Sequence, residues 1–192
     1  GIDGINISLD SCDPKTYAEI TGSDCLEEVL AAIEEAYALG LPVKINCVPL
    51  NNMQLADLLA MVELVKERNI SLRFIELMPL SCNSELQGLS GEAIREMFGE
   101  AGIKLLEEKA LLGNGPAVYY RAEGYAGAIG FIEPFLNTFY CISKAFNPYA
   151  SFPILCLNGK TPVINLISHS EKNSSEFVPA CSNSKTNFNI FS

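Results

Sequence analysis

The sequence lacks long apolar runs and has few positive charges. No apolar stretch reaches the ~18 residues that predict a membrane span, so we expect no membrane contact. The chain has 13 Lys and Arg residues against 23 Asp and Glu residues, and its formal net charge is −10. This balance argues against nucleic acid as a partner, because a phosphate backbone is bound mainly through clustered cations. A few converging Lys and Arg side chains could still bind a small anion.

Paired cysteine motifs are also missing. The seven cysteines are an odd number and include no C-x-x-C pair, so a disulfide framework is not expected. Reduced thiols favour a reducing intracellular compartment, cytoplasmic in a bacterium or mitochondrial in a eukaryote. Cys25 and Cys47 fall in helix and strand patterns, where cysteine usually acts as a small core hydrophobe. No Met or charged leader precedes Gly1, so the sequence starts like a fragment without a targeting peptide.

Strand and helix patterns alternate in the first part of the chain. Strands are predicted near residues 4–9, 42–48 and 71–77, with helices near 14–20, from Asp24 to Gly40, and near 53–68. Asp13-Pro14 and the capping-box pattern that starts at Asp24 predict helix beginnings. This order predicts parallel βαβ units with right-handed crossovers. An α/β barrel and a doubly wound sheet both satisfy it.

The alternation of strand and helix patterns ends beyond Pro79. A polar loop over 81–89 precedes a helix that Ser90 caps, and residues 118–121 and 128–132 predict two short strands of a hairpin. Beyond Phe135 the apolar residues show no sustained helical or strand periodicity. Residues 168–192 are rich in Ser and Asn, a composition that favours disorder.

Polar residues interrupt the three predicted strands at every second position. They are Asn6, Ser8 and Asp10 in the first strand, Lys44 and Asn46 in the second, and Glu76 in the third, with Met78 just beyond. Covered parallel strands are normally continuous apolar runs. Side chains alternate between the faces of a strand, and ligands bind at the carboxyl ends of strands in α/β folds. The pattern therefore predicts a polar binding site, with buried structural polar groups as the alternative.

Arg73 does not fit this pattern when positions are counted from Glu76. Its parity is opposite to that of Glu76, so a regular strand would direct Arg73 toward the helices. We expect it to join the site only if the strand is bulged.

These segments resemble successive motifs of a known family. Asn6-Ile7-Ser8-Leu9-Asp10, Pro42-Val43-Lys44-Ile45-Asn46 and Arg73-Phe74-Ile75-Glu76-Leu77-Met78-Pro79 look like motifs of the GTP 3',8-cyclases, radical S-adenosylmethionine enzymes of molybdenum cofactor biosynthesis. Residues 115–121 and 129–134 continue the resemblance in order. The resemblance covers residues 1 to 134.

The resemblance implies a fold and a division of the chain. The expected fold class is α/β: residues 1–88 form the later βα units of an incomplete, TIM-type radical-SAM barrel. Residues 89–134 form a small α+β part of the C-terminal cluster and GTP domain, and residues 135–192 form a divergent, irregular tail.

The resemblance also implies ligands. Ser8 and Met78 would bind S-adenosylmethionine, Lys44 would bind the substrate GTP, and Asn6, Asn46 and Glu76 would support the polar site. A hydroxyl suits a sugar, an ammonium suits phosphate, and a thioether can pack on a purine. A solvated Lys44, a locally bonded Ser8 and a core Met78 are the alternatives. The full-length family carries 4Fe-4S clusters and is expected to form homodimers.

The departures from the family concern the metal ligands. The C-x-x-x-C-x-x-C motif for the radical-generating cluster is absent, and Lys144 stands where a second ligand of the other cluster is expected. Cys141 and Cys156 remain, whereas iron–sulfur clusters commonly need three or four protein ligands. We therefore expect this chain alone to be inactive. The alternatives are a Schiff-base barrel lyase that uses Lys44, and a non-catalytic truncated product.

Overall fold

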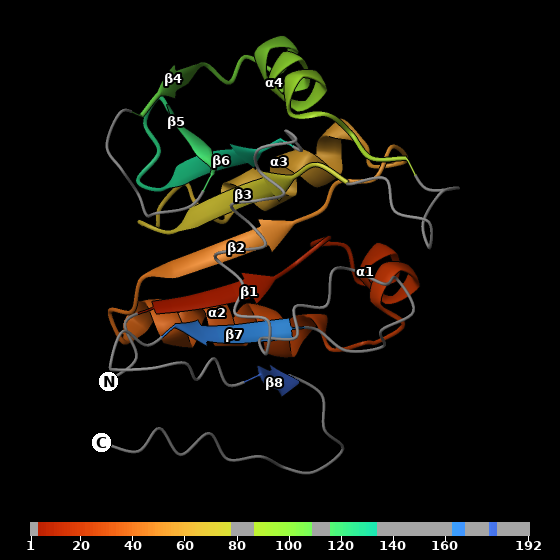
Figure 1. Cartoon of the computed structure of the whole chain (residues 1–192), viewed down its shortest axis with the longest axis vertical. Coiled ribbons are helices and arrows are strands. Elements are labelled where there is room, and N and C mark those ends of the chain that lie inside the picture. Colours follow the sequence, from red (N-terminus) through yellow and green to blue (C-terminus); the bar gives the residue numbers. More distant parts are fainter. Residues whose placement is uncertain (1–3, 78–86, 109–115, 134–162, 168–176, 180–192) are drawn as a thin grey trace.

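The computed structural model describes residues 4–77, 87–108, 116–133, 163–167 and 177–179. Across these ranges no helix combines the length and apolar character needed to cross a membrane. Figure 1 shows a sheet that runs through the described part of the molecule, with its helices packed behind it.

Four helices and eight strands are present in these ranges. The helices are α1 (Pro14–Thr21), α2 (Leu26–Ala38), α3 (Leu55–Glu63) and α4 (Gly91–Glu100). The strands are β1 (Gly4–Ser8), β2 (Val43–Cys47), β3 (Ser71–Ile75), β4 (Leu105–Glu107), β5 (Val118–Ala122), β6 (Ala128–Ile132), β7 (Val163–Ile167) and β8 (Phe177–Pro179).

The strands form one sheet in the order β4-β5-β6-β3-β2-β1-β7-β8. The pairs β1–β2, β2–β3 and β3–β6 are parallel, so the predicted parallel βαβ units are confirmed. β5 and β6 pair antiparallel, as the predicted hairpin requires. The α/β class is confirmed, whereas the incomplete, TIM-type barrel stays a prediction; among the described strands the outermost, β4 and β8, each pair with one neighbour.

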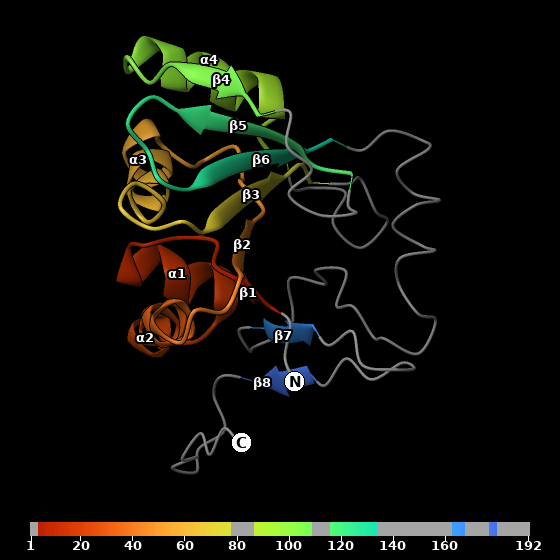
Figure 2. The ribbon, with the colours of Figure 1, turned by 90° about the vertical axis from the view of Figure 1, so that its left-hand side faces the viewer.

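The core lies on the helix-covered face of the sheet. Helices α1, α2 and α3 lie on one side of the sheet (Figure 2). Every second residue of β1, β2 and β3 faces this side, and Ile7, Ile45 and Leu72 are each fully buried there. Helix α4 packs on the same face, because the ring of Phe98 lies 6.0 Å from that of Phe74. The opposite face therefore carries the half-buried polar positions.

Local sequence signals explain the helix starts. Asp13 caps α1, its carboxylate accepting the Thr16 N–H at 2.8 Å, with Pro14 in the first turn. Ser90 caps α4 in the same way through Ala93. The capping box expected at Asp24 does not form, since Cys25 occupies the N-cap of α2 and its side chain makes no capping hydrogen bond. Helix α3 ends at Glu63, earlier than predicted, and turns follow it.

Two expectations for the chain need correction. The region after Phe135 supplies β7 and β8, although its sequence shows no periodic signal; β7 is five residues long and β8 is three. Cys47 is a buried core residue with a free thiol, as expected, but Cys25 is only partly buried and is disulfide-bonded. The prediction of a core thiol is therefore wrong for Cys25.

Candidate polar site on the sheet

Two rows of residues cross the open face of the sheet. The first joins Ser8, Asn46, Arg73, Gly130 and Tyr119 across five adjacent strands. The second joins Asn6 to Lys44 on the same face. Residues opposite one another in adjacent strands share a face, so the structure brings Asn6, Ser8, Lys44 and Asn46 together as the alternation predicted.

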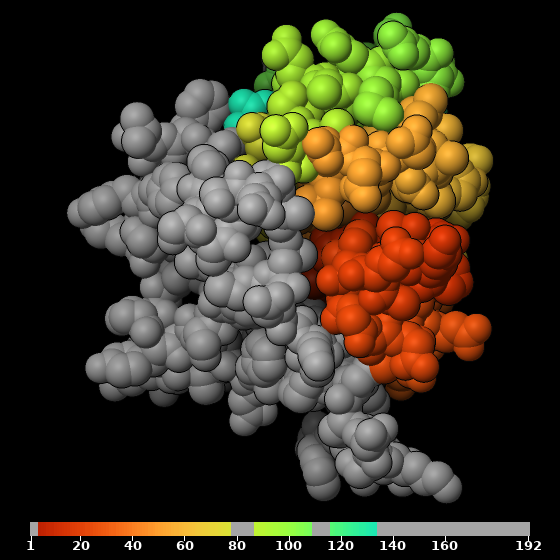
Figure 3. Space-filling view, turned by 90° about the vertical axis from the view of Figure 1, so that its right-hand side faces the viewer, coloured from red at the N-terminus to blue at the C-terminus, as the bar shows by residue number. Residues whose placement is uncertain are grey.

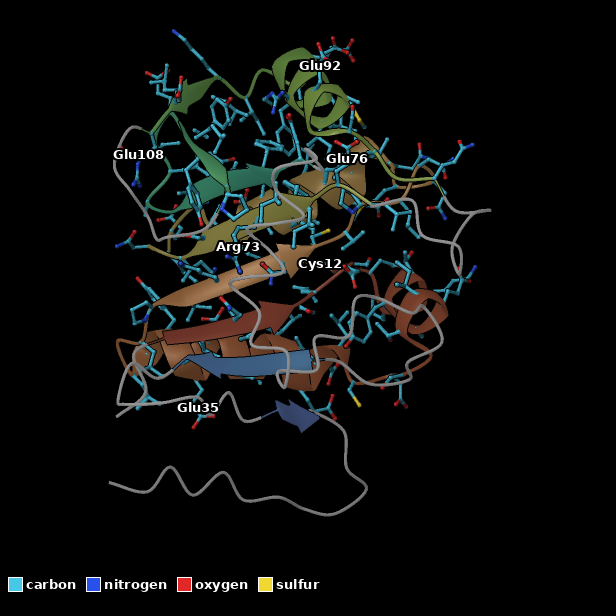
Figure 4. The ribbon with its side chains drawn as sticks, in the orientation of Figure 1. Cys12, Glu35, Arg73, Glu76, Glu92 and Glu108 are labelled. Carbon is cyan, nitrogen blue, oxygen red and sulfur yellow. The ribbon has the colours of Figure 1, made fainter. Side chains whose placement is uncertain are left out.

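Arg73 lies at the centre of this face and binds across three strands. Its Nε donates to Asn46 Oδ1 at 2.7 Å, and its Nη2 donates to Asn6 Oδ1 at 3.2 Å. The expectation that Arg73 points toward the helices is wrong. The strand is regular and ends at Ile75, so Glu76 lies outside it and gave a false reference for counting. Figure 4 shows Arg73 within the sheet and Glu76 beyond the end of β3.

Lys44 and Arg73 place two cationic side chains on this face without a carboxylate partner among the described residues. Burial lowers the pKa of Lys44, and the charge of Arg73 lowers it further. Burial also lowers the pKa of Arg73, an effect that its interaction with Tyr119 opposes. Two like charges that are partly removed from water favour an anion between or beside them.

Gly130 and Tyr119 complete the row, and sequence reasoning did not assign them to the site. A Cβ built on Gly130 would lie 2.9 Å from the Tyr119 ring and 3.2 Å from Arg73 Cγ. Glycine therefore lets both side chains cross over the β6 backbone. The sequence signal for these two residues is the alternation of side chains along the predicted hairpin. That alternation assigns them to the site only when the register between β6 and β3 is known.

Asp10 follows the end of β1 and is buried. Its Oδ1 accepts the Val48 N–H at 2.8 Å, which ties the carboxyl ends of β1 and β2 together. Burial raises the pKa of Asp10 to about 6, against the opposing effect of that hydrogen bond. The carboxyl ends of β1 and β2 point toward the viewer of Figure 3, which shows the red and orange residues on that side of the molecule.

The remaining predicted residues are less informative. Glu76 is half-buried, its N–H donates to the Ile132 carbonyl at 3.0 Å, and it forms no ion pair within the described ranges. Met78, Cys141 and Cys156 lie outside the described residues. Among the residues that the structure does describe, no group of three His, Cys, Asp or Glu could hold a metal ion. The described donor set thus does not fit an iron–sulfur cluster.

The fold and this face define an α/β protein with a cationic, amide-rich site on a mainly parallel sheet. Curated relatives have sequences similar to that of this chain. It is 37% identical over 139 residues to a GTP 3',8-cyclase of Clostridium perfringens, and 38% identical over 143 residues to one of Synechococcus elongatus; each match covers 72% of this chain and 43% of the relative. A GTP 3',8-cyclase of Photorhabdus laumondii is 36% identical over 143 residues, with the same coverage.

The chain is therefore related to the GTP 3',8-cyclases, and the resemblance predicted from its motifs is confirmed. The matched region spans less than half the length of these relatives. No family model matches the chain.

Proposed function

We propose that this chain supplies part of the GTP-binding surface of a GTP 3',8-cyclase in molybdenum cofactor biosynthesis. The observation that carries the proposal is the pair of cations, Lys44 and Arg73, on one half-buried polar face without a carboxylate partner among the described residues. Phosphate groups satisfy such cations, and the planar guanidinium adds directional donors. The relatives' name supplies GTP as the nucleotide.

The proposed roles follow the chemistry of each group. Lys44 contributes a point charge to the phosphates. Arg73 holds the amides of Asn6 and Asn46 in place, interacts with Tyr119, and adds a second positive charge beside Lys44. Ser8 lies next to Asn46 and offers its hydroxyl to S-adenosylmethionine. When bound, that cofactor supplies the radical that starts the cyclisation of GTP; in this proposal Met78 packs against its adenosyl part.

Titration calorimetry of the whole chain with GTP tests the proposal. Lys44→Ala should weaken GTP binding at least tenfold, since a phosphate would lose a charge-assisted partner. Lys66→Ala is the matched control: Lys66 is exposed, pairs with Glu63 and lies outside this face. Guanosine should bind the wild-type chain and Lys44→Ala equally. Absence of GTP binding by the wild-type chain, or equal GTP affinity of both lysine variants, would reject the assignment.

We further propose that the chain alone does not turn over. The sequence has no C-x-x-x-C-x-x-C motif, and two thiolates at Cys141 and Cys156 are too few for a cluster. Anaerobic reconstitution with iron and sulfide should therefore yield no cleavage of S-adenosylmethionine. Detection of 5'-deoxyadenosine above a no-protein control would show this proposal to be wrong without affecting the GTP-binding test.

A second candidate function rests on the lowered pKa of Lys44. A lysine with a lowered pKa is unprotonated more often and can attack a carbonyl to form a Schiff base. Borohydride reduction with a panel of small aldehydes and ketones, followed by peptide mapping, would detect an adduct at Lys44. Preferential labelling of Lys44 over exposed Lys15 would favour a lyase, whereas equal labelling would remove this candidate.

A further inference from the structure

Arg73 is hydrogen-bonded to two side-chain amides, and its chemistry fixes how those amides are turned. A guanidinium group can only donate hydrogen bonds. The amide atoms that face Arg73 must therefore be oxygens: Asn46 Oδ1 accepts from Nε at 2.7 Å, and Asn6 Oδ1 accepts from Nη2 at 3.2 Å. The Nδ2 group of each amide, on the other branch of the same planar group, is left for another partner.

The Nδ2 groups of Asn6 and Asn46 have no hydrogen-bond partner among the described residues. Both side chains are half-buried. In the described part of the chain, Tyr17 Oη is the one unpaired polar side-chain atom that is fully removed from solvent. The two amide nitrogens therefore reach the open surface of the sheet, and each keeps two N–H donors for a ligand.

The surroundings of these amides also consist mainly of hydrogen-bond donors. Asn6 lies opposite Lys44 in the adjacent strand. The Nζ of Lys44 can only donate, and it pairs with no carboxylate of the described residues. Asn46 lies between Ser8 and Arg73 in the row that crosses the sheet. Because Arg73 takes both amide oxygens, a ligand group that fits here must carry acceptors, as an oxyanion does.

We propose that the Nδ2 groups of Asn6 and Asn46 donate directly to an oxyanion of the bound ligand, and that Arg73 is the positioning residue that holds both amides ready. The oxyanion is a phosphate of GTP or the carboxylate of S-adenosylmethionine, since both present several acceptor oxygens. The inference rests on the proposed function, because it concerns ligand binding at the same face. It changes the role of the two asparagines from support to direct contact.

Preorganisation explains why an arginine occupies this central position (Figure 4). The terminal torsion of an asparagine side chain is broad, so an unrestrained amide would lose that freedom on binding an anion. Arg73 restrains two amides at once, because its donors have a fixed planar geometry. A lysine at this position would keep the positive charge and lose the planar donors.

Side-chain amide NMR of the unmodified chain tests the direct contact. The Nδ2 protons of Asn6 and Asn46 should shift downfield on addition of GTP or of S-adenosylmethionine, whereas those of exposed Asn69 should stay unchanged. Separate titrations show which of the two ligands provides the oxyanion, and inorganic triphosphate should reproduce the shift if it is a phosphate. Unchanged resonances of Asn6 and Asn46 with both ligands would overturn the proposal.

Calorimetry on variants of the whole chain tests the positioning role, with the ligand that shifts the amides. Asn46→Leu removes the donor, and Arg73→Lys removes the planar geometry but keeps the charge. Each should weaken binding about tenfold or more. The double variant should bind within about threefold of the weaker single variant, because both changes break one arrangement. Arg68→Lys is the matched control, since Arg68 pairs with exposed Glu34.

Fully additive losses, or wild-type affinity of Arg73→Lys, would overturn the positioning role. If Asn46→Leu does not fold, Asn46→Asp takes its place, because its carboxylate can still accept from Arg73 while the donor is lost. Its affinity should also fall about tenfold or more, and unchanged affinity would overturn the direct contact.

These outcomes are separable from those of the proposed function. GTP binding that depends on Lys44, with unchanged amide resonances, would overturn this inference and leave the proposed function standing. Amide shifts with S-adenosylmethionine alone, together with equal GTP affinity of the two lysine variants, would reject the assignment to GTP and retain the oxyanion contact.

Discussion

At the scale of single residues, Arg73 holds the polar face together. Its guanidinium is the donor to Asn46 and Asn6 on two other strands. Arg73→Ala should leave both amide oxygens without this donor and lower the free energy of unfolding by about 1–3 kcal/mol. Urea unfolding at constant pH measures the change. Arg68→Ala is the control, because Arg68 pairs with exposed Glu34 and such pairs contribute about 0–1 kcal/mol. Equal effects of the two variants would contradict the central role of Arg73.

The buried carboxyl of Asp10 predicts an unusual dependence of stability on pH. Its pKa rises from 3.8 to about 6 on folding, so the folded state favours the neutral form. The stability from this group is full below pH 4 and is lost as the pH rises through 6, by up to about 3 kcal/mol. Asp10→Asn should therefore be more stable than the wild type above pH 7, and its stability should change less between pH 4 and 7. Urea unfolding at a series of pH values measures both.

Asp13 provides a comparison with the opposite sign. Hydrogen bonds from Thr16 lower the pKa of this exposed carboxyl, so its stabilising effect is present at neutral pH and is lost as the pH falls through the folded pKa. Asp13→Asn should thus reduce stability most at neutral pH. If Asp10→Asn and Asp13→Asn shift the pH profile in the same direction, the burial explanation for Asp10 is wrong.

At the scale of elements, the connection into β6 depends on Gly127. A Cβ on this residue would lie 2.3 Å from the Ile70 carbonyl oxygen and 2.6 Å from that of Arg68, both backbone atoms that cannot rotate away. Gly127→Ala should cost at least ~1–3 kcal/mol, the range for overpacking. Gly99→Ala in α4 has open space around the new methyl and should stabilise by about 0.5–1 kcal/mol. Thermal unfolding of both variants compares them directly, and similar melting temperatures would contradict this account.

The sequence predicts elements with strong local signals. Asp13, Ser90 and the apolar alternation of β1 and β2 act within a few residues, so the helices and strands that they define are found where expected. Contacts between distant segments leave no such signal. The insertion of β6 beside β3, which places Gly130 and Tyr119 in the site, depends on packing of the whole sheet. Strand β7 likewise pairs with β1, although the two strands are far apart in the sequence.

The difference between local signals and long-range contacts also explains why only some of the site residues were placed correctly from the sequence. Alternation placed Asn6, Ser8, Lys44 and Asn46 on one face because they lie inside regular strands. Arg73 was misplaced because the end of β3 is not marked in the sequence, and counting began one residue outside the strand. Side chains alternate between faces, so a reference residue outside the strand that is assigned to the wrong face reverses the predicted face of every side chain counted from it.

At the scale of the whole molecule, one sheet and one aromatic cluster join regions that the sequence divides at residue 88. Phe74 of β3 stacks with Phe131 of β6 at 5.8 Å, and Phe98 of α4 lies beside Phe74. Each of these rings is at most 2% exposed. We therefore expect β1–β3 and β5–β6 to unfold as one cooperative unit, because separating them would expose the cluster.

Phe131→Ala tests this unity, since truncation of a buried phenylalanine costs about 3–5 kcal/mol. If the unit is cooperative, amide exchange should accelerate in β2 as well as in β6, although Phe131 lies on β6. Val118→Ala is the control, because Val118 is 49% exposed and its loss should affect neither strand. Acceleration confined to β4–β6, with β2 protection unchanged, would instead indicate two independently folding parts. That result would support the division near residue 88 that the sequence predicts.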